Sequence, residues 1–594
     1  MKSLILSCAV LLAASFAFGQ STANNTSACS ANGAPTAGCN GVGNMPYLGN
    51  PSDTGLQTSV LDPLPVNTST LSVKSLLYSG ATTRLAFLHV PYFCNTSDPC
   101  NGHDVIGMQE SNFAQALEQA EWMKTLGGDV VVEDWYGCSS SCGQSSAQAY
   151  NLSVTAALAG AISGNPSATP KFMIMLDQGA INSTGTGQCP PASGDQSACL
   201  ESAIETQIDY AAKNWLFQSY YETNANNGHP IVLYFITKGN WPDTNFTTVY
   251  SAIAAHATAG NSCGSGCTYS ATVDFVDENA GAFSESGIAG GFAWPQPNTY
   301  SSSNQFCWEG SPCSFNYLAN FYSTARANSS KIAMGSLSKG FNDYNASWGT
   351  NRVTAQQCGQ VLGFTAGEIA SAGYNSSSQL QYALVATWND YEESTEVETG
   401  VNNCITINQP VISGSTLSWS LDKSDATYAS TSTINSFQIY TGTSSPTTLY
   451  ASGISPTATS YAAPSLAPGE SAWVYMVGQP LIQNALSPAV SQSFATLTVA
   501  VSGAGSVSSS PSGISCPSTC SASYAMGTVV TLTATPSGGA SFSGWSGGGC
   551  SGTGACATTV NSSLLVNAVF SAVAAPGHAL VGPMTITMPA TIVP

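Results

Sequence analysis

Short apolar runs recur along the middle of the chain, and longer stretches with helical periodicity separate them. Runs of this length and composition are typical of strands buried on both faces of a parallel sheet. Eight such runs occur between residues 85 and 390. They lie at 85–92, 129–135, 171–179, 230–238, 271–278, 288–295, 331–340 and 383–390.

The stretches between the runs predict helices that pack one apolar face against the sheet. The connection at 279–287 is the exception, because it is too short for a full helix. Strands that alternate with helices over eight units predict a (β/α)8 TIM barrel, which we place at residues 81–404. Apolar residues at helical spacing are clearest at Phe113, Leu117, Ala120 and Met123, and at Leu200, Ile204, Ile208 and Ala211.

After Cys404 the helical pattern stops, and short strands with turn signals follow. Residues 405–495, with the apolar Trp419, resemble a fibronectin type III-like β-sandwich. Residues 496–572 contain "GTVVTLTATP" and "FSGWSGGGCSGTGAC" and resemble the bacterial B-repeat module. The chain is therefore predicted to be multidomain, a barrel followed by two accessory all-β modules and a tail at 573–594.

The N-terminus is typical of a secretory signal peptide at residues 1–19, with Lys2, an apolar run and a small residue before Gln20. Residues 20–80 form a leader rich in Ser, Thr and Asn. No later segment reaches the roughly 18 uninterrupted apolar residues of a membrane span. Cys8 lies inside the apolar run rather than at its end, which disfavours a lipoprotein anchor. We expect a secreted protein, extracellular or at the cell surface, without membrane insertion.

The cysteines after Cys8 fall into neighbouring pairs, which in an exported chain predicts disulfides. A zinc site is disfavoured, because no His lies beside a short Cys pair. Most loops are short, so each bridge is expected to close one surface loop. The expected pairs are Cys29–Cys39, Cys94–Cys100, Cys138–Cys142, Cys189–Cys199, Cys263–Cys267, Cys307–Cys313, Cys358–Cys404, Cys516–Cys520 and Cys550–Cys556.

The charge balance limits the choice of partner. The chain has 12 basic and 32 acidic residues and a net charge of −20, which argues against nucleic acid or an anionic membrane. A neutral polymer such as a polysaccharide fits better. We expect a monomer without a metal ion or cofactor.

Polar and aromatic residues gather where the predicted strands end, which in a TIM barrel is where active sites lie. Trp faces can stack on sugar rings, while neighbouring polar groups bind the hydroxyls. A single acid at a strand end is more often an ion pair or a helix cap, but Arg and Lys are too few to pair all of them. The predicted substrate-binding residues are His89, Asp134, Trp135, Asp177, Lys238, Trp294, Trp388, Tyr391 and Glu396.

The densest acidic segment is "ATWNDYEESTEVETG", residues 386–400, in a chain with only 7% charged residues. Asp390 and Glu393 are three positions apart where the chain leaves the eighth strand, so one turn can direct both toward the barrel mouth. Glycoside hydrolysis needs two such carboxyl groups, and neighbouring acids help to keep one protonated. A Ca²⁺ site is the alternative, but no Asp-Gly loop pattern accompanies the acids.

The segment "TWNDYEES" also resembles the Trp-Asn-Asp-Tyr-Gly-Glu-Ser signature of glycoside hydrolase family 71, with Glu392 in place of Gly. That family comprises α-1,3-glucanases, or mutanases, and the endo-acting α-mannosidases of family 99 are distant kin. The resemblance covers about residues 84–400, with weaker matches at 85–92, 171–179, 230–241 and 290–295. It implies an inverting, endo-acting α-glucanase in which Asp390 is the base and Glu393 the acid. The residues after His89, "VPYF", and Glu392 depart from the family pattern.

Two other functions remain open. The chain could hydrolyse another α-glycan, such as an α-mannan. It could also be a non-catalytic glycan-binding or adhesive protein, which the two C-terminal β modules suggest. A binder would not need two acids facing one cavity, so the arrangement at the barrel mouth distinguishes these readings.

Overall fold

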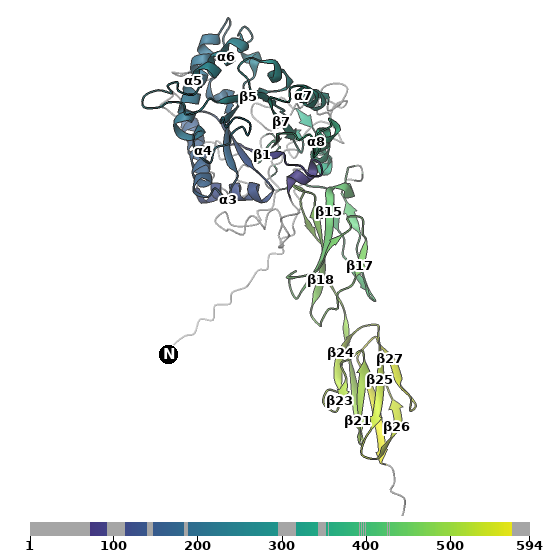
Figure 1. Cartoon of the computed structure of the whole chain (residues 1–594). Coiled ribbons are helices and arrows are strands. Elements are labelled where there is room, and N and C mark those ends of the chain that lie inside the picture. The colour runs from purple at the N-terminus through teal and green to yellow at the C-terminus, as the bar shows by residue number, and fades with distance from the viewer. Residues whose placement is uncertain are drawn as a thin grey trace, which may run out of the picture.

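The computed structural model shows one barrel followed by two β modules (Figure 1). The structure describes residues 72–91, 113–138, 146–182, 188–294, 316–342, 352–354, 356–390, 393, 395, 397, 400–424, 426 and 428–572. The predicted signal peptide, most of the leader and the tail lie outside these residues, as do Tyr391, Glu392, Glu396 and Glu398. Among the described residues, no helix has both the length and the apolar character needed to cross a membrane.

The barrel is closed by eight parallel strands, which confirms the predicted fold. Around the barrel the order is β1-β10-β7-β6-β5-β4-β3-β2. Each strand lies within one of the apolar runs seen in the sequence, apart from the first residue of two of them. The strands are β1 (Arg84–His89), β2 (Val130–Trp135), β3 (Lys171–Asp177), β4 (Ile231–Phe235), β5 (Asp274–Glu278), β6 (Gly290–Phe292), β7 (Ile332–Leu337) and β10 (Tyr382–Val385).

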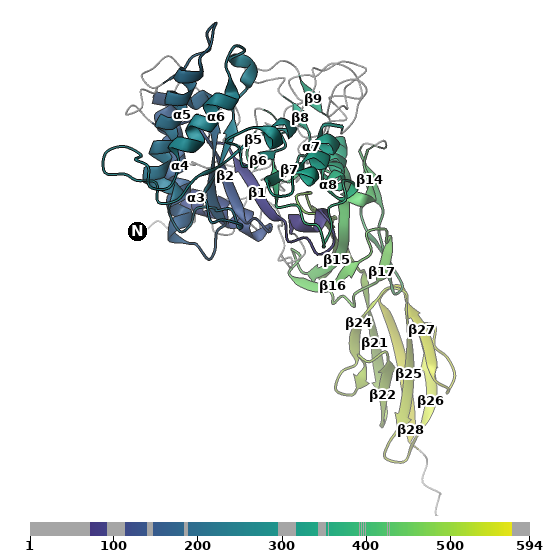
Figure 2. The ribbon, with the colours of Figure 1, turned by 45° about the horizontal axis from the view of Figure 1, so that its top comes forward.

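Helices cover the outside of the barrel (Figure 2). They are α3 (Phe113–Thr125), α4 (Ser146–Gly164), α5 (Ser197–Ala211), α6 (Phe246–His256), α7 (Asn316–Ala327) and α8 (Gln360–Ser371). The short connection after β5 forms only the 3₁₀ helix η9 (Ala280–Ser284), as its length predicts. A small hairpin, β8 (Phe341–Asn342) with β9 (Val353–Thr354), follows β7.

The alternation of side chains along each strand builds two separate cores. Leu88, Val132 and Met175 belong to the core inside the barrel, whereas Phe87 and Val131 belong to the core between strands and helices. We call these the inner core and the outer core. They matter for the site, because a residue's place in the alternation decides whether its side chain reaches the mouth.

The predicted apolar faces of the helices agree with the structure except at one position. All four apolar residues predicted on α5 are buried, but Phe113 at the start of α3 is 50% exposed. Being the first residue of its helix, Phe113 extends beyond the outer core. The barrel domain begins earlier than the predicted residue 81. Val73 in η3 (Val73–Leu76) is fully buried in the outer core, so the chain joins the barrel before that residue.

The first β module is a sandwich. One sheet has the order β12-β13-β17, another has β16-β15-β18-β19 with β20 also on β18, and β11 pairs with β14. Its specific likeness to a fibronectin type III domain stays a prediction. The strands are β11 (Ile405–Ile407), β12 (Val411–Ser413), β13 (Thr416–Ser418), β14 (Leu421–Lys423), β15 (Ile434–Gly442), β16 (Thr448–Ile454), β17 (Ser460–Ala462), β18 (Ser471–Gly478), β19 (Ala485–Leu486) and β20 (Val490–Ser491).

The last module has a core of its own between two four-stranded sheets. In Figures 1 and 2 it extends away from the barrel, whereas the sandwich lies against it. The sheet orders are β24-β21-β28-β26 and β23-β22-β25-β27. The strands are β21 (Phe494–Ser502), β22 (Gly505–Ser510), β23 (Ser515–Cys516), β24 (Ser521–Ala525), β25 (Thr528–Pro536), β26 (Ala540–Ser546), β27 (Cys556–Val560) and β28 (Leu564–Ala572).

The described cysteines form the predicted disulfides. Cys138 is also disulfide-bonded. The oxidised cysteines of the described residues fit an oxidising compartment outside the cytosol. The confirmed pairs are Cys189–Cys199, Cys263–Cys267, Cys358–Cys404, Cys516–Cys520 and Cys550–Cys556, while the pairs at Cys29, Cys94 and Cys307 lie outside the described residues.

Candidate active site

Two strand-end acids point into the barrel mouth. Asp134 follows Val132 of the inner core by two positions, and Asp177 follows Met175 in the same way. Because side chains two apart along a strand share a face, both carboxyl groups lie above the inner core. Each is only 6% exposed.

Tyr136 joins these acids to the segment after β10. It follows Asp134 by two positions, and its hydroxyl hydrogen-bonds to the Asp134 carboxyl. Burial raises the pKa of Tyr136 well above its ordinary value, and so do the charges of Asp134, Asp177, Asp390 and Glu393, in that order. All four carboxyl groups therefore lie within electrostatic reach of one phenol. The sequence analysis missed Tyr136, although its spacing from Asp134 was a usable signal.

The environment of this cluster disfavours full ionisation. Burial raises the pKa of Asp134 well above its ordinary value, and the charges of Asp177, Glu133 and Asp390 add to the rise, while the hydrogen bond with Tyr136 opposes it. One oxygen of Asp134, Oδ1, is buried without a hydrogen-bond partner among the described residues. A buried acceptor left open in this way is suited to a ligand hydroxyl.

Asp177 gives a prediction that is independent of any reaction. Burial raises the pKa of Asp177 from 3.8 to about 7, only partly opposed by backbone N–H groups of Gly179 and Gln178. Between these pH values the folded state holds a proton that the unfolded state releases, so the free energy of unfolding falls as pH rises to about 7. Replacing Asp177 by Asn should therefore stabilise the protein by up to about 4 kcal/mol at pH 8 and hardly at pH 4.

The measurement is denaturant unfolding followed by Trp fluorescence at both pH values. Asp422→Asn, a substitution of an exposed acid on β14, is the matched control and should change little at either pH. An equal gain for Asp177→Asn at pH 4 and pH 8 would contradict the prediction.

The segment after β10 forms a closed turn that carries Asp390 and Glu393. The N–H of Thr387 donates to the carbonyl of Thr395 at 3.2 Å, and the N–H of Thr395 donates to the carbonyl of Asp390 at 3.0 Å. Within the turn, the N–H of Glu393 donates to Asp390 Oδ1 at 3.0 Å. Both acids are half-buried, and one turn joins them. That both side chains face the mouth stays a prediction.

His89 is paired with an acid on the neighbouring strand. Its Nδ1 lies 2.6 Å from Oε2 of Glu133, and Glu133 Oε1 accepts a hydrogen bond from Thr155 of α4 at 2.8 Å. Glu133 shares its strand face with Val131 and is fully buried in the layer between strands and helices. His89 follows Phe87 of the outer core by two positions and is 2% exposed, so the His89–Glu133 pair lies behind the strands rather than in the mouth.

The mouth has an aromatic side that complements the acidic one. Phe235 at the end of β4 and Trp294 after β6 are half-buried and pack on the inner core. Their ring centroids are 4.6 Å apart and their planes are inclined by 45°. Since β2, β3 and the segment after β10 carry four of the acids and β4 and β6 carry the rings, one side of the mouth is acidic and the other aromatic. Glu278 at the end of β5, two positions after Val276 of the inner core, adds one acid to the aromatic side.

Lys238 forms ion pairs at the end of β4. Its Nζ lies 2.8 Å from Oδ2 of the buried Asp277 and also contacts Glu285. Burial raises the pKa of Asp277 to about 7, although the charge of Lys238 opposes the rise. The charge of Lys238 is thereby balanced by two acids, one of which, Glu285, the sequence analysis did not single out.

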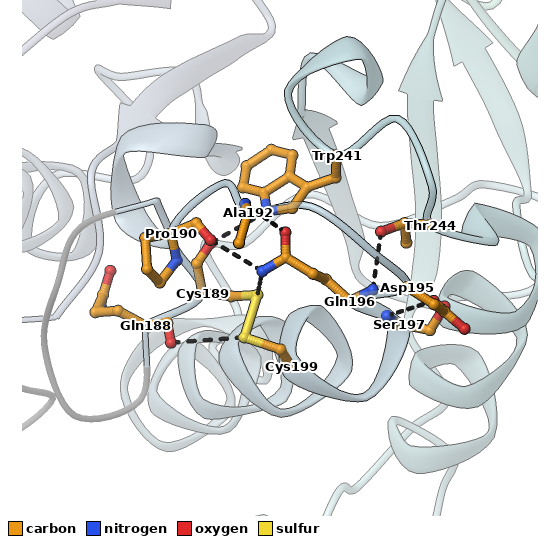
Figure 3. Close-up of a disulfide and its surroundings, with 10 residues drawn as sticks. All are labelled: Gln188, Cys189, Pro190, Ala192, Asp195, Gln196, Ser197, Cys199, Trp241 and Thr244. Atoms are coloured by element: carbon orange, nitrogen blue, oxygen red, sulfur yellow. Dashed lines mark hydrogen bonds between the residues drawn. A yellow bond between two sulfur atoms is a disulfide. The ribbon is translucent and has the colours of Figure 1, made fainter.

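Three of the tryptophans near the strand ends lie outside the mouth. Trp135 and Trp388 are 0% exposed and belong to the outer core, where Trp388 donates through Nε1 to Gln119 at 3.2 Å. Trp241 is equally buried, and Figure 3 shows it beside the Cys189–Cys199 disulfide, where its Nε1 donates to the Cys189 carbonyl at 3.2 Å. Direct contact of substrate with Trp135 or Trp388, which the sequence analysis expected, does not fit this burial.

The structure therefore brings some of the predicted site residues together and places others away from the mouth. It brings together Asp134, Asp177, Asp390 and Glu393, with Trp294 across the mouth, whereas His89 lies behind the strands with Glu133. Tyr391 and Glu396 lie outside the described residues. Among the residues that the structure describes, no group of three or more His, Cys, Asp or Glu side chains is arranged to hold a metal ion.

Comparison with known proteins identifies the last module. Residues 495–574 match the model of the divergent InlB B-repeat domain. The predicted resemblance to a bacterial B-repeat module is confirmed. Among solved structures, that of a Cellulomonas fimi endo-beta-1,4-mannanase double mutant is similar at 10% identity, with 69% of this chain and 94% of that chain covered and a TM-score of 0.30. No curated protein matches the chain.

Proposed function

We propose that the barrel is a glycoside hydrolase that cleaves an α-glycan outside the cell. One observation carries the proposal: four carboxyl groups from β2, β3 and the segment after β10 lie within electrostatic reach of Tyr136, at the C-terminal ends of the strands of a TIM barrel. Glycosidases need one protonated and one ionised carboxyl group. In a cluster of buried acids, burial and neighbouring charges can separate the pKa values of two such groups.

In the proposed reaction Asp390 is the general base and Glu393 the general acid. Asp390 Oδ1 accepts the N–H of Glu393, and a hydrogen bond to a carboxylate favours its ionised form, as a base requires. Glu393 would protonate the leaving oxygen while Asp390 activates water on the opposite face of the sugar, so the anomeric configuration would invert. The resemblance to family 71 supports the same assignment and an endo-acting attack on an α-1,3-glucan.

The remaining groups of the mouth have proposed roles in binding. The open oxygen of Asp134 and the half-exposed face of Trp294 provide a hydroxyl acceptor and a stacking surface for a sugar ring. We propose that Asp177 contacts substrate on the acidic side and that His89, paired with Glu133 behind the strands, has a supporting role. For Lys238 we also propose a supporting role, because its Nζ pairs with the buried Asp277 and lies over the rings of Phe246 and Tyr250 on α6.

The test is release of reducing sugar from a panel of α-1,3-glucan, other α-glucans, α-mannan and β-glucans by the full chain. We expect cleavage of α-1,3-glucan with an inverted anomer, read by NMR at early times. Cleavage of α-mannan alone would support the proposed glycoside hydrolysis but replace α-1,3-glucan with α-mannan as the substrate. Binding to a glycan without any cleavage would favour the non-catalytic reading instead.

A further inference from the structure

The sandwich shares a core with the barrel. On β18, Val474 and Met476 face the sandwich's own core, whereas Tyr475 and Val477 belong to the outer core of the barrel. A strand of an antiparallel sheet usually leaves one face to solvent, yet seven of the eight residues of β18 are buried here. Tyr440 of β15 joins the same outer core. One face of this sheet is therefore packed against the barrel.

The contact is continuous with the segment that carries Asp390 and Glu393. Val401 donates its N–H to the Leu481 carbonyl at 2.7 Å, and Gln483 donates to the Val401 carbonyl at 2.9 Å. Val401 and Ile482 thus form a parallel bridge between barrel and sandwich. We call Val401 with residues 481–483 the junction.

The junction is closely packed on the barrel side. A Cβ on Gly359 would lie 2.7 Å from Ile482 Cδ1, so a side chain there would push Ile482 aside, and the φ of +82° also favours glycine. The next residue back, Cys358, is disulfide-bonded to Cys404, three positions after Val401. Val401 is fully buried and Ile482 is 6% exposed. Ile482 therefore packs against Gly359, directly before α8, and beside Val401.

A short series of backbone contacts connects the junction to the acids. Val397 donates to the Trp388 carbonyl at 2.9 Å, and Trp388 donates to the Leu88 carbonyl of β1 at 2.6 Å. Between these two contacts lies the closed turn with Asp390 and Glu393. The turn is therefore hydrogen-bonded to β1 through Trp388 at its start. Four residues after Val397, at Val401, the chain is hydrogen-bonded to the sandwich.

We propose that the sandwich is part of the active site as a positioning element, with Ile482 as the positioning residue for Asp390 and Glu393. The inference rests on the proposed function for its catalytic readout. It replaces the expectation that both β modules are accessory, which now applies to the B-repeat module alone. Displacement of catalytic groups by about 1 Å can cost on the order of a hundredfold in rate, so loss of this contact should act on turnover.

The experiment compares Ile482→Ala with Ile454→Ala in the full chain. Ile454 at the end of β16 is also 6% exposed, but it belongs to the sandwich's own core, so the two substitutions are matched in burial and differ in position. We expect Ile482→Ala to lower kcat roughly tenfold to a hundredfold with little change in KM. Ile454→Ala should leave kcat unchanged below its unfolding temperature, and Ile482→Val should restore most of the activity.

Hydrogen exchange separates this inference from the proposed function. Amide exchange of the 387–401 segment should accelerate at least tenfold in Ile482→Ala and not in Ile454→Ala, whether or not the chain cleaves any glycan. Absence of turnover in the unaltered protein would overturn the proposed function alone. Equal exchange and equal kcat in the two Ala variants would overturn the positioning role. If Ile482→Ala does not fold, Ile482→Val is compared with Ile454→Val by hydrogen exchange of the same segment, and equal exchange in these two variants would overturn the positioning role.

Discussion

Replacing Asp390 by Asn, or Glu393 by Gln, is expected to lower turnover of the cleaved glycan by roughly two to four orders of magnitude, the usual scale of general acid–base assistance. Asn at 390 can still accept the N–H of Glu393 through its amide oxygen, so the turn keeps its hydrogen bond while the base is lost. Gln at 393 keeps the shape of the acid but has no proton to donate.

The measurement is kcat on a soluble oligosaccharide, with the thermal unfolding midpoint recorded for each variant. Asp422→Asn on the sandwich is the control and should retain full activity. Near-normal kcat in either active-site variant would contradict the assignment and move the chemistry to another acid of the mouth, such as Asp177 or Glu278. Retention of the anomeric configuration would likewise exclude an inverting pair.

Replacing Trp294 by Ala is expected to raise KM about thirtyfold and leave kcat nearly unchanged. The ring is half-buried on the inner core, and its remaining surface would be covered by a sugar, which is worth about 2 kcal/mol. Contacts made equally to substrate and transition state act on KM rather than on kcat.

Two control variants accompany this measurement. Trp294→Phe keeps an aromatic face above Phe235 and should lose much less affinity. Trp241→Phe alters a ring that is 1% exposed and away from the mouth, so it should lower stability without a change in KM. A fall in kcat for Trp294→Ala with unchanged KM would show that Trp294 is not a binding surface.

The sequence was most informative where the local pattern alone decides the structure. Buried parallel strands need apolar residues at nearly every position, and that requirement made all eight barrel strands visible as runs. The carboxyl ends of parallel strands meet at one rim, which is why Asp134 and Asp177 could be expected near the segment at 386–400.

Other features depend on contacts that no local pattern records. Trp135 ends β2 and Trp294 follows β6, but Trp135 belongs to the outer core and Trp294 packs on the inner core at the mouth. The partner of Lys238, Glu285, is 47 residues away in the chain and comes from a loop beside β6. Trp388 follows an irregular end of β10, where alternation no longer applies. Strand register would have found Tyr136, since it continues the face of Asp134.

The two β modules differ in whether their cores are independent of the barrel. The B-repeat module encloses its own core, so evolution can transfer it between unrelated proteins as an exchangeable cassette without loss to either neighbour. The sandwich is not transferable in this way. Its residues Tyr475, Val477 and Ile482 pack in the outer core of the barrel, so separating the two domains would expose apolar surface on both. Barrel and sandwich must therefore be inherited together, and substitutions on one side of their contact should be accompanied by compensating changes on the other.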